Sequence, residues 1–196
     1  MSLHVDNPFT LFQEWLTKAE QTEPNDPNAM SLATVDETGM PNVRMVLLKE
    51  FDETGFVFYT NFDSQKGHEL TANPRAALCL HWKSLQRQVR IQGHISQVSA
   101  EQADAYFASR GREKCIGAWA SHQSHPLEER WALEKRIAKY ALKFGLGPVP
   151  RPHFWGGYHL KPTQIEFWKA HPLRLHERVR CTLNPEGQWE NQLLFP

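Results

Sequence analysis

The sequence predicts a mainly β protein with peripheral helices, an α+β chain folded as a single domain. Short runs rich in apolar and β-branched residues alternate with turn residues through the first half of the chain. The tetrapeptide Asp-Glu-Thr-Gly occurs at 36–39 and again at 52–55, and it separates the first three runs as hairpin-type turns. This spacing suits an antiparallel meander or a small barrel. A length of 196 residues allows one substantial core but is short for two.

Composition argues against several classes of partner. The 22 basic and 22 acidic residues balance, so no global field attracts nucleic acid or an anionic membrane surface. Cys79, Cys115 and Cys181 are far apart, which argues against a disulfide framework and a zinc site. The N-terminus does not read as a signal peptide, and no apolar run is long enough to span a bilayer. We therefore expect a cytoplasmic protein that binds no metal, nucleic acid or membrane.

The first element is expected to be a packed helix over about 7–21. Asn7 suits the N-cap and Pro8 the first helical position, and Phe9, Phe12 and Leu16 begin an apolar stripe. Two prolines within 23–28 end this helix. Strands are then expected at 29–35, 43–50, 55–61, 76–82 and 88–98.

Three further helices are expected among the strands. Ser64 can cap a short one that reaches Leu70, and Ser99 with Gln102 forms a capping box for a second that reaches about 110. A longer helix follows Pro126 and ends at Gly145. The proline-rich stretch 147–152 is interpreted as a connector, and the region from about 150 to 196 as the last strands of the same domain.

A cationic motif near the C-terminus indicates an anion site. Arg174, His176 and Arg178 occupy every second position, so in an extended strand all three would project from one face. Such groups repel one another unless an anion lies among them, and arginine forks match phosphate well. Phe167 and Trp168 precede the turn and would add an aromatic wall, which favours a ligand with a ring.

Other candidate binding residues are weaker when taken singly. Arg44 and Lys49 bracket an apolar strand on opposite faces, where they serve two anions or are ordinary strand-end charges. Lys66 opens the 64–70 helix, whose free amides favour an anion. Tyr106 and Arg110 lie four residues apart on one helix face, where they clamp a phosphate or simply pack together.

Together these segments resemble the pyridoxamine 5′-phosphate oxidase family along nearly the whole chain. The segments are 44–49 (Arg-Met-Val-Leu-Leu-Lys), 58–61 (Phe-Tyr-Thr-Asn), 64–67 (Ser-Gln-Lys-Gly), 87–89, 106–110, 116–118, 123–124, 155–157, 166–168 and 174–178. The resemblance implies an FMN-binding split β-barrel that works as a homodimer with two flavins at the subunit interface, and residues from about 150 to 196 would form the dimerisation and substrate region. It also implies oxidation of pyridoxine or pyridoxamine 5′-phosphate to pyridoxal 5′-phosphate. A hydride would pass from C4′ to flavin N5, and O2 would reoxidise the flavin to give hydrogen peroxide.

The resemblance also implies roles for particular residues. The FMN site would comprise Arg44, Met45, Val46, Leu47, Leu48, Lys49, Tyr59, Thr60, Gln65, Lys66, Gln88, Gln123, Ser124, Trp168 and Arg178. The substrate would be bound by Lys49, Tyr106, Arg110, Lys114, Arg174 and His176. Arg174 and His176 would be the catalytic pair, which orients and polarises the substrate over the flavin without forming a covalent bond to it.

Several positions depart from the family pattern. Lys114 stands where a serine is usual, Lys169 follows Trp168 where a glutamine is more common, and the ending 193–196 (Leu-Leu-Phe-Pro) replaces Arg-Leu-Ala-Pro. The chain also starts almost directly at the first helix, without the longer arm of its relatives. Two alternatives stay open. One is a related FMN oxidoreductase acting on another substrate, as in phenazine pathways, and the other is a non-catalytic protein that binds FMN or pyridoxal phosphate.

Overall fold

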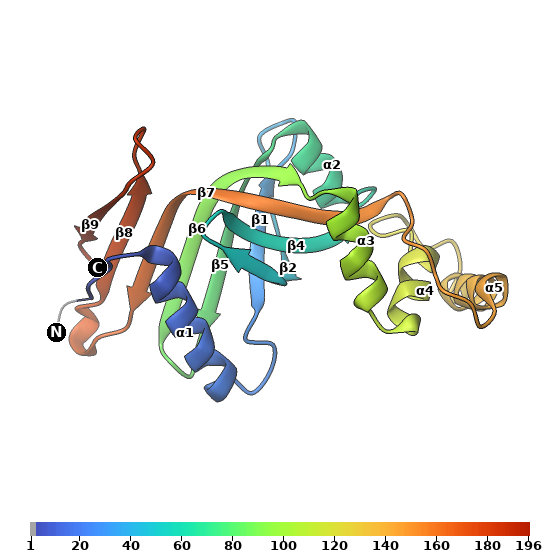
Figure 1. Ribbon diagram of the computed structural model, residues 1–196, viewed down its shortest axis with the longest axis horizontal. Coiled ribbons are helices and arrows are strands. Elements are labelled where there is room, and N and C mark those ends of the chain that lie inside the picture. Colours follow the sequence, from blue (N-terminus) through green and yellow to red (C-terminus); the bar gives the residue numbers. More distant parts are fainter. Residues whose placement is uncertain (1–2) are drawn as a thin grey trace.

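The computed structural model describes residues 3–196 as one antiparallel sheet surrounded by helices (Figure 1). The strands are β1 (Ala29–Val35), β2 (Pro41–Leu47), β3 (Glu50–Asp52), β4 (Gly55–Asn61), β5 (Arg75–Trp82), β6 (Arg87–Gln97), β7 (Trp155–Lys169), β8 (Glu177–Leu183) and β9 (Trp189–Leu194). The helices are α1 (Pro8–Thr22), α2 (Gln65–Ala72), α3 (Ala100–Ser109), α4 (Arg112–Ala120) and α5 (Ala132–Phe144), with a short 3₁₀ helix η1 at Pro172–Arg174. The predicted α+β class is confirmed.

The sheet curls but does not close. Its strand order is β2-β1-β5-β6-β7-β4-β3, with β8 added to β7 and β9 to β8. The long strand β7 changes partner along its length, because its first part pairs with β4 and its last part with β8. The register between β6 and β7 shifts at Gln92 and Gly93, and an irregularity of this kind bends the strands. The result is the split β-barrel that the sequence was expected to form.

The predicted N-terminal helix is present as α1, and it covers one side of the sheet. The Asn7 side chain accepts hydrogen bonds from the backbone nitrogens of Phe9 and Thr10, which fixes the first turn. Phe12 is fully buried and makes edge contacts with the rings of Phe51 and Phe56. The helix therefore packs against β3 and β4 and shields this part of the core from solvent.

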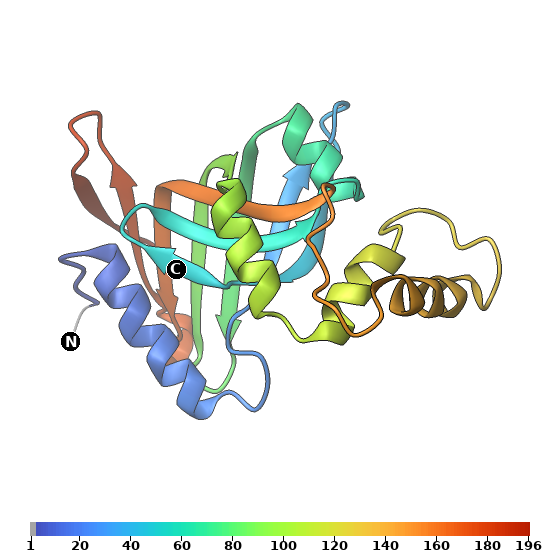
Figure 2. The same cartoon turned by 45° about the vertical axis from the view of Figure 1, so that its right-hand side comes forward.

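Helices α4 and α5 extend from the opposite side of the sheet (Figure 2). Helix α4 was not predicted, because its short sequence follows Gly111, contains Gly117 and has no apolar periodicity of its own. Helix α5 begins at Ala132, later than expected, and ends at Gly145 with a positive φ, as expected. Arg112 of α4 donates to the carbonyls of Gly145 and Gly147, just after the end of α5. Arg136 of α5 donates to the carbonyl of Ala120 at the end of α4, so each helix caps the other.

Two predicted strands are broken. The run 43–50 divides because the nitrogen of Leu48 bonds to Asn28 and that of Lys49 bonds to Val57, so the chain crosses from β1 to β4. The predicted cationic strand face is wrong. Arg174 lies in η1 with a φ of 61°, and β8 begins only at Glu177. Pro172 starts a tight turn there, which leaves Arg178 alone in the strand.

The capping predictions are met in part. The Ser99 hydroxyl accepts from the nitrogen of Gln102, but the Gln102 amide donates to Glu50 instead of completing the box. Ser64 is the N-cap residue of α2 without a side-chain cap bond, since its hydroxyl donates to the carbonyl of Asn61. Across residues 3–196, the helices are too short or too polar to cross a membrane.

Two helical glycines should respond in opposite ways to alanine. A Cβ on Gly67 would lie 2.0 Å from the Phe62 carbonyl oxygen, whereas a Cβ on Gly117 meets nothing within 4 Å. We expect Gly67→Ala to lower the free energy of unfolding by about 1–3 kcal/mol through overpacking. We expect Gly117→Ala to raise it by about 0.5–1 kcal/mol through helix propensity. Urea unfolding followed by circular dichroism measures both, and shifts of the same sign would contradict the prediction.

Candidate functional site

A cavity of about 620 Å³ lies where β2 and β4 meet α2, α3 and α4. It brings together many residues that the sequence analysis singled out: Met45, Val46, Leu47, Lys49, Tyr59, Thr60, Lys66, Tyr106, Arg110, Lys114 and Gln123. It also includes residues without a predicted role: Asn61, Ser109, Gly111, Ala118, Ser121 and Trp155. Trp155 could have been found, because it opens the Trp-Gly-Gly segment that carried part of the family resemblance.

Three near-parallel rings form one wall of this cavity. The ring of Tyr59 stacks on that of Tyr106 with centroids 3.8 Å apart, and on that of Trp155 at 5.6 Å. The Tyr59 hydroxyl donates to Glu50 at 2.8 Å, and burial together with this bond raises the pKa of Tyr59. A Cβ at Gly157 would lie 2.7 Å from the Tyr59 ring, so glycine is needed for the stack. The wall is planar and suits a flat ligand.

Arg110 lines the cavity and has a buried donor without a partner. Its guanidinium lies 4.6 Å from the ring centroid of Trp155 and 5.4 Å from that of Phe107. Its Nη1 is buried and has no hydrogen-bond partner among the described residues. A buried N–H without an acceptor costs free energy, and an anion would remove that cost.

Lys66 places a buried amine at the start of α2. Its Nζ donates to the Ser64 hydroxyl at 3.1 Å and to the Gln123 side-chain oxygen at 3.0 Å. Burial, reinforced by the charge of Arg44 and opposed by that of Glu69, lowers the pKa of Lys66 to about 8. Both of its hydrogen-bond partners, Ser64 and Gln123, are neutral, so its charge is not balanced by a direct contact. The free amides of the helix N-terminus add to the attraction for an anion.

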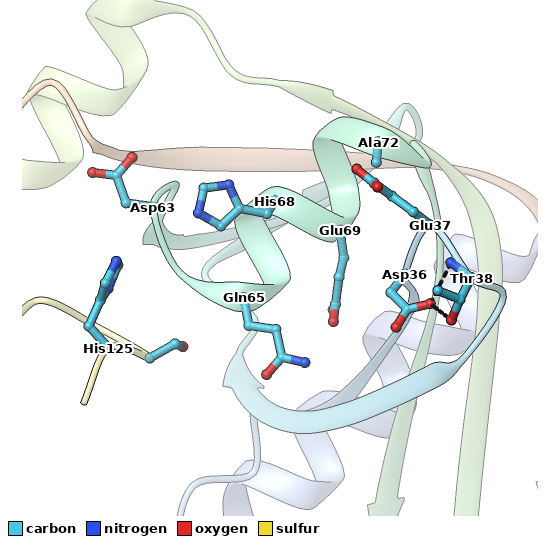
Figure 3. A pocket seen from close by; sticks show the side chains of 10 residues that line it. Asp36, Glu37, Thr38, Asp63, Gln65, His68, Glu69, Ala72 and His125 are labelled. Atoms are coloured by element: carbon cyan, nitrogen blue, oxygen red, sulfur yellow. Dashed lines mark hydrogen bonds between the residues drawn. The ribbon is translucent and has the colours of Figure 1, made fainter.

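Other predicted residues lie beside this cavity. Leu48 is buried in the core, and Arg44 donates to Glu69 on α2 at 2.9 Å. Gln65 and Ser124 line a neighbouring cavity of about 520 Å³ alongside α2. Figure 3 shows this cavity, with Asp36 and Thr38 at one side and His125 at the other.

The remaining predicted residues form a second cluster at the far end of β7. Gln88, Trp168 and Arg178 are register partners on β6, β7 and β8. The His176 ring lies 4.7 Å from that of Trp168, and Arg174 is exposed on the adjoining turn. Arg178 donates to Glu166 at 2.8 Å.

The two clusters are far apart within one chain. Trp155 begins β7 and lines the cavity, whereas Trp168 is near its end. The 15 residues of the strand correspond to about 45 Å measured along it. Figures 1 and 2 both show the β8 end of the sheet well away from α3 and α4. The side chains thus form two half-sites, one cationic and aromatic, the other built around Trp168 and His176.

The cavity fits a phosphorylated ring compound. A planar aromatic wall can stack on the ring, while the orphaned Arg110 donor, the buried Lys66 amine and the start of α2 can receive phosphate oxygens. Lys49 and Lys114 at the lining add further positive charge. The donors are oxygen-seeking cations, amides and hydroxyls, which is the composition that a phosphate ester requires.

Comparison with known proteins gives the chain a family. Residues 16–144 match the family model described as pyridoxamine 5′-phosphate oxidase, and residues 155–196 match the C-terminal dimerisation region of pyridoxine 5′-phosphate oxidase. Proteins named pyridoxine/pyridoxamine 5′-phosphate oxidase from Brucella canis and Brucella abortus (strain 2308) are 58% identical over 190 residues. The alignment covers 96% of this chain and 94% and 91% of theirs.

Solved structures agree on the fold. PhzG from Burkholderia lata 383, in complex with tetrahydrophenazine-1-carboxylic acid, superposes with a TM-score of 0.90 at 33% identity, covering 97% of this chain and 93% of its own. A pyridoxamine 5′-phosphate oxidase-related, FMN-binding protein from Nostoc punctiforme superposes with a TM-score of 0.77 at 17% identity, covering 98% and 99%. With two family models covering most of its length and relatives at 58% identity, the chain belongs to the pyridoxamine 5′-phosphate oxidase family.

Proposed function

We propose that this protein is an FMN-dependent pyridoxine/pyridoxamine 5′-phosphate oxidase. The reaction converts either substrate to pyridoxal 5′-phosphate with O2 as electron acceptor, giving hydrogen peroxide and, from the amine, ammonia. The relatives at 58% identity carry this name. The observation that carries the proposal is the cavity itself, where an aromatic wall meets a buried lysine and an arginine donor without a partner.

FMN binds where its phosphate meets the start of α2. Lys66 and Arg44 supply positive charge there, and the hydroxyl and amide groups of Thr60, Gln65, Gln123 and Ser124 supply hydrogen bonds. Residues 45–49, at the end of β2 and just after it, and Tyr59 would lie along the flavin, while Gln88, Trp168 and Arg178 would contact it from the second half-site. FMN supplies the hydride acceptor when bound.

The substrate phosphate occupies the part of the cavity lined by α3 and α4. Lys49, Tyr106, Arg110 and Lys114 bind its oxygens, with Arg110 using the donor that has no protein partner. A phosphate monoester carries about −1.5 to −2 charges near neutrality, so several cations are needed to hold it. Arg174 and His176 cover the reacting carbon, orient its substituent and exclude water.

A homodimer brings the half-sites together. The C-terminal residues match a dimerisation region, and β2 presents an apolar strip to the outside, with Val43 70% and Met45 61% exposed. In a twofold dimer, the second half-site of one subunit meets the cavity of its partner, and symmetry generates two equal sites.

A second candidate is oxidation of a reduced phenazine precursor. The superposition with PhzG, whose structure holds tetrahydrophenazine-1-carboxylic acid, favours it. Identity to that protein is 33%, compared with 58% to the pyridoxine/pyridoxamine 5′-phosphate oxidases. A non-catalytic binding protein is the third reading, and turnover distinguishes all three.

The decisive experiment is a turnover assay of the FMN-loaded protein. We expect pyridoxine 5′-phosphate and pyridoxamine 5′-phosphate to yield the aldehyde and peroxide in equal amounts, because the two electrons of one hydride, with two protons, reduce one O2 to hydrogen peroxide. Unphosphorylated pyridoxine is the control for phosphate recognition, and a dihydrophenazine carboxylate tests the second candidate. A flavin-loaded protein that forms no aldehyde from either phosphate ester refutes the proposal.

Shared sites predict complementation between two inactive variants. Arg110→Met disables the cavity and Arg174→Met disables the other half-site, so each homodimer should have little activity. In a mixed dimer, one site carries both defects and the other carries neither, so activity should return to about half that of the normal dimer. Two affinity tags isolate the mixed dimer. If both residues act within one subunit, the mixed dimer stays inactive.

FMN affinity should fall as the pH rises above about 8, the pKa of Lys66 in the free protein. A bound phosphate stabilises the ammonium form and raises this pKa in the complex. Affinity is therefore complete below pH 8 and decreases above it by up to about tenfold per pH unit. Quenching of flavin fluorescence between pH 6.5 and 9.5, values chosen around that pKa, measures it. Lys66→Arg should remove the decrease, because a guanidinium stays charged; a persisting decrease would contradict the assignment.

A further inference from the structure

Glu69 is a buried carboxylate with no assigned role in binding. It lies on α2, one turn after Gln65, and only 5% of its surface is exposed. Three side chains donate to its two oxygens: Thr34 from β1, and Asn42 and Arg44 from β2. Figure 3 shows Glu69 and Gln65 extending from the same side of the helix.

The carboxylate is charged in spite of its burial. Burial raises the pKa of Glu69, but the hydrogen bonds from Thr34 and Arg44 and the Arg44 charge outweigh it, so the pKa falls below its usual value. A buried charge is tolerated where it is paired and hydrogen-bonded, as this one is. Glu69 therefore holds the Arg44 guanidinium through a charge-assisted hydrogen bond of 2.9 Å.

The bond from Arg44 to Glu69 affects how Arg44 and Lys66 are arranged around α2. Arg44 and Lys66 repel each other, as the effect of Arg44 on the Lys66 amine shows. Glu69 attracts both, and it belongs to the same helix as Lys66. Two cations and one carboxylate leave a net positive charge beside free helix amides, which is a preorganised anion site.

A purely mechanical role is the competing explanation. The hydrogen bonds of Glu69 tie α2 to β1 and β2, and a neutral side chain of the same shape would maintain much of that tie. A neutral side chain would hold the guanidinium only through a weaker, uncharged hydrogen bond and would not offset the repulsion between Arg44 and Lys66. The two explanations therefore predict different results when the charge alone is removed.

We propose that Glu69 is a positioning residue for the FMN phosphate, which it serves by holding Arg44 against α2, the helix that carries Lys66 in its first turn. The inference rests on the proposed function, because it takes Arg44 and Lys66 as ligands of that phosphate. Glu69 itself does not touch the flavin. Its contribution is to keep the second cation in place before the ligand arrives.

The test compares FMN with riboflavin, which has the same ring system and no phosphate. Glu69→Gln keeps the size of the side chain and removes its charge. We expect the variant apoprotein to bind FMN about tenfold more weakly, the scale of one charged hydrogen bond. Riboflavin affinity should stay within about twofold, because the ring contacts are unchanged. Flavin fluorescence quenching gives both dissociation constants.

A double-mutant cycle shows whether Glu69 acts through Arg44. Once Arg44→Met has removed the guanidinium, adding Glu69→Gln should cost little further FMN affinity. Leu70→Val is the matched control, since it loosens the packing of the same helix without changing a charge. This control should leave the ratio of FMN to riboflavin affinity unchanged.

The outcomes separate this inference from the proposed function. If Glu69→Gln leaves the affinity ratio unchanged while Arg44→Met lowers it, the positioning role is overturned and the proposed function stands. Equal losses for both flavins would likewise overturn it in favour of the mechanical role. If the unaltered protein binds FMN no better than riboflavin, the proposed phosphate site is itself refuted. Should Glu69→Gln not fold, Thr34→Val removes a bond to the same oxygen and must lower the ratio.

Discussion

The pairing of β6 with β7 is the constraint on which the arrangement of the whole molecule depends. Strand β7 has 15 residues, of which 158–169 pair with β6, and it exchanges β4 for β8 as its second neighbour partway along. The irregularity at Gly93 permits the bend, because a Cβ there would lie 2.0 Å from the Lys161 carbonyl oxygen. One continuous strand thus carries cavity residues at one end and the Trp168 cluster at the other. Because the strand is paired along its length, the chain cannot fold back to join them.

Two cationic side chains at the cavity lack partners that a bound anion would supply. Lys66 is largely desolvated and has only neutral direct partners, and Arg110 has a buried donor without an acceptor. Both conditions cost stability in the free protein. An anion that binds only the folded chain recovers this cost and stabilises the fold by mass action. The chain as a whole has no net charge, so these cations form a local positive cluster and do not belong to a general basic surface.

Local patterns determined how much of the structure could be predicted. The Asn7-Pro8 start of α1, the hairpin turns at 36–39 and 52–55, and the Gly145 end of α5 depend on neighbouring residues, so their chemistry is visible in sequence. The alternation of Arg174, His176 and Arg178 predicted a continuous strand that is not present. The positive φ of Arg174 is incompatible with a strand there.

Non-local contacts determined what could not be predicted. Helix α4 is held by the bond from its Arg112 to the carbonyl of Gly147 and by the bond from Arg136 of α5 to its Ala120 carbonyl. Such contacts between distant residues cannot be read from the sequence of the helix itself. The candidate residues were identified as one set, and their division into two half-sites became visible only from the course of β7. The buried partner of Arg44 was equally hidden, since Glu69 lies 25 residues away and has the sequence context of an ordinary helix residue.

The charge of the cavity bears on the choice between the two candidate substrates. A carboxylate such as that in the PhzG complex carries one negative charge, whereas a phosphate monoester carries nearly two and three oxygens that accept hydrogen bonds. The lining supplies Lys49, Arg110 and Lys114, together with the Tyr106 hydroxyl. Three cations around a monoanion leave an excess of about two positive charges, while around a dianion the excess is about one. Lys114, the departure from the usual serine, adds to this positive charge and so favours the phosphate ester over the carboxylate.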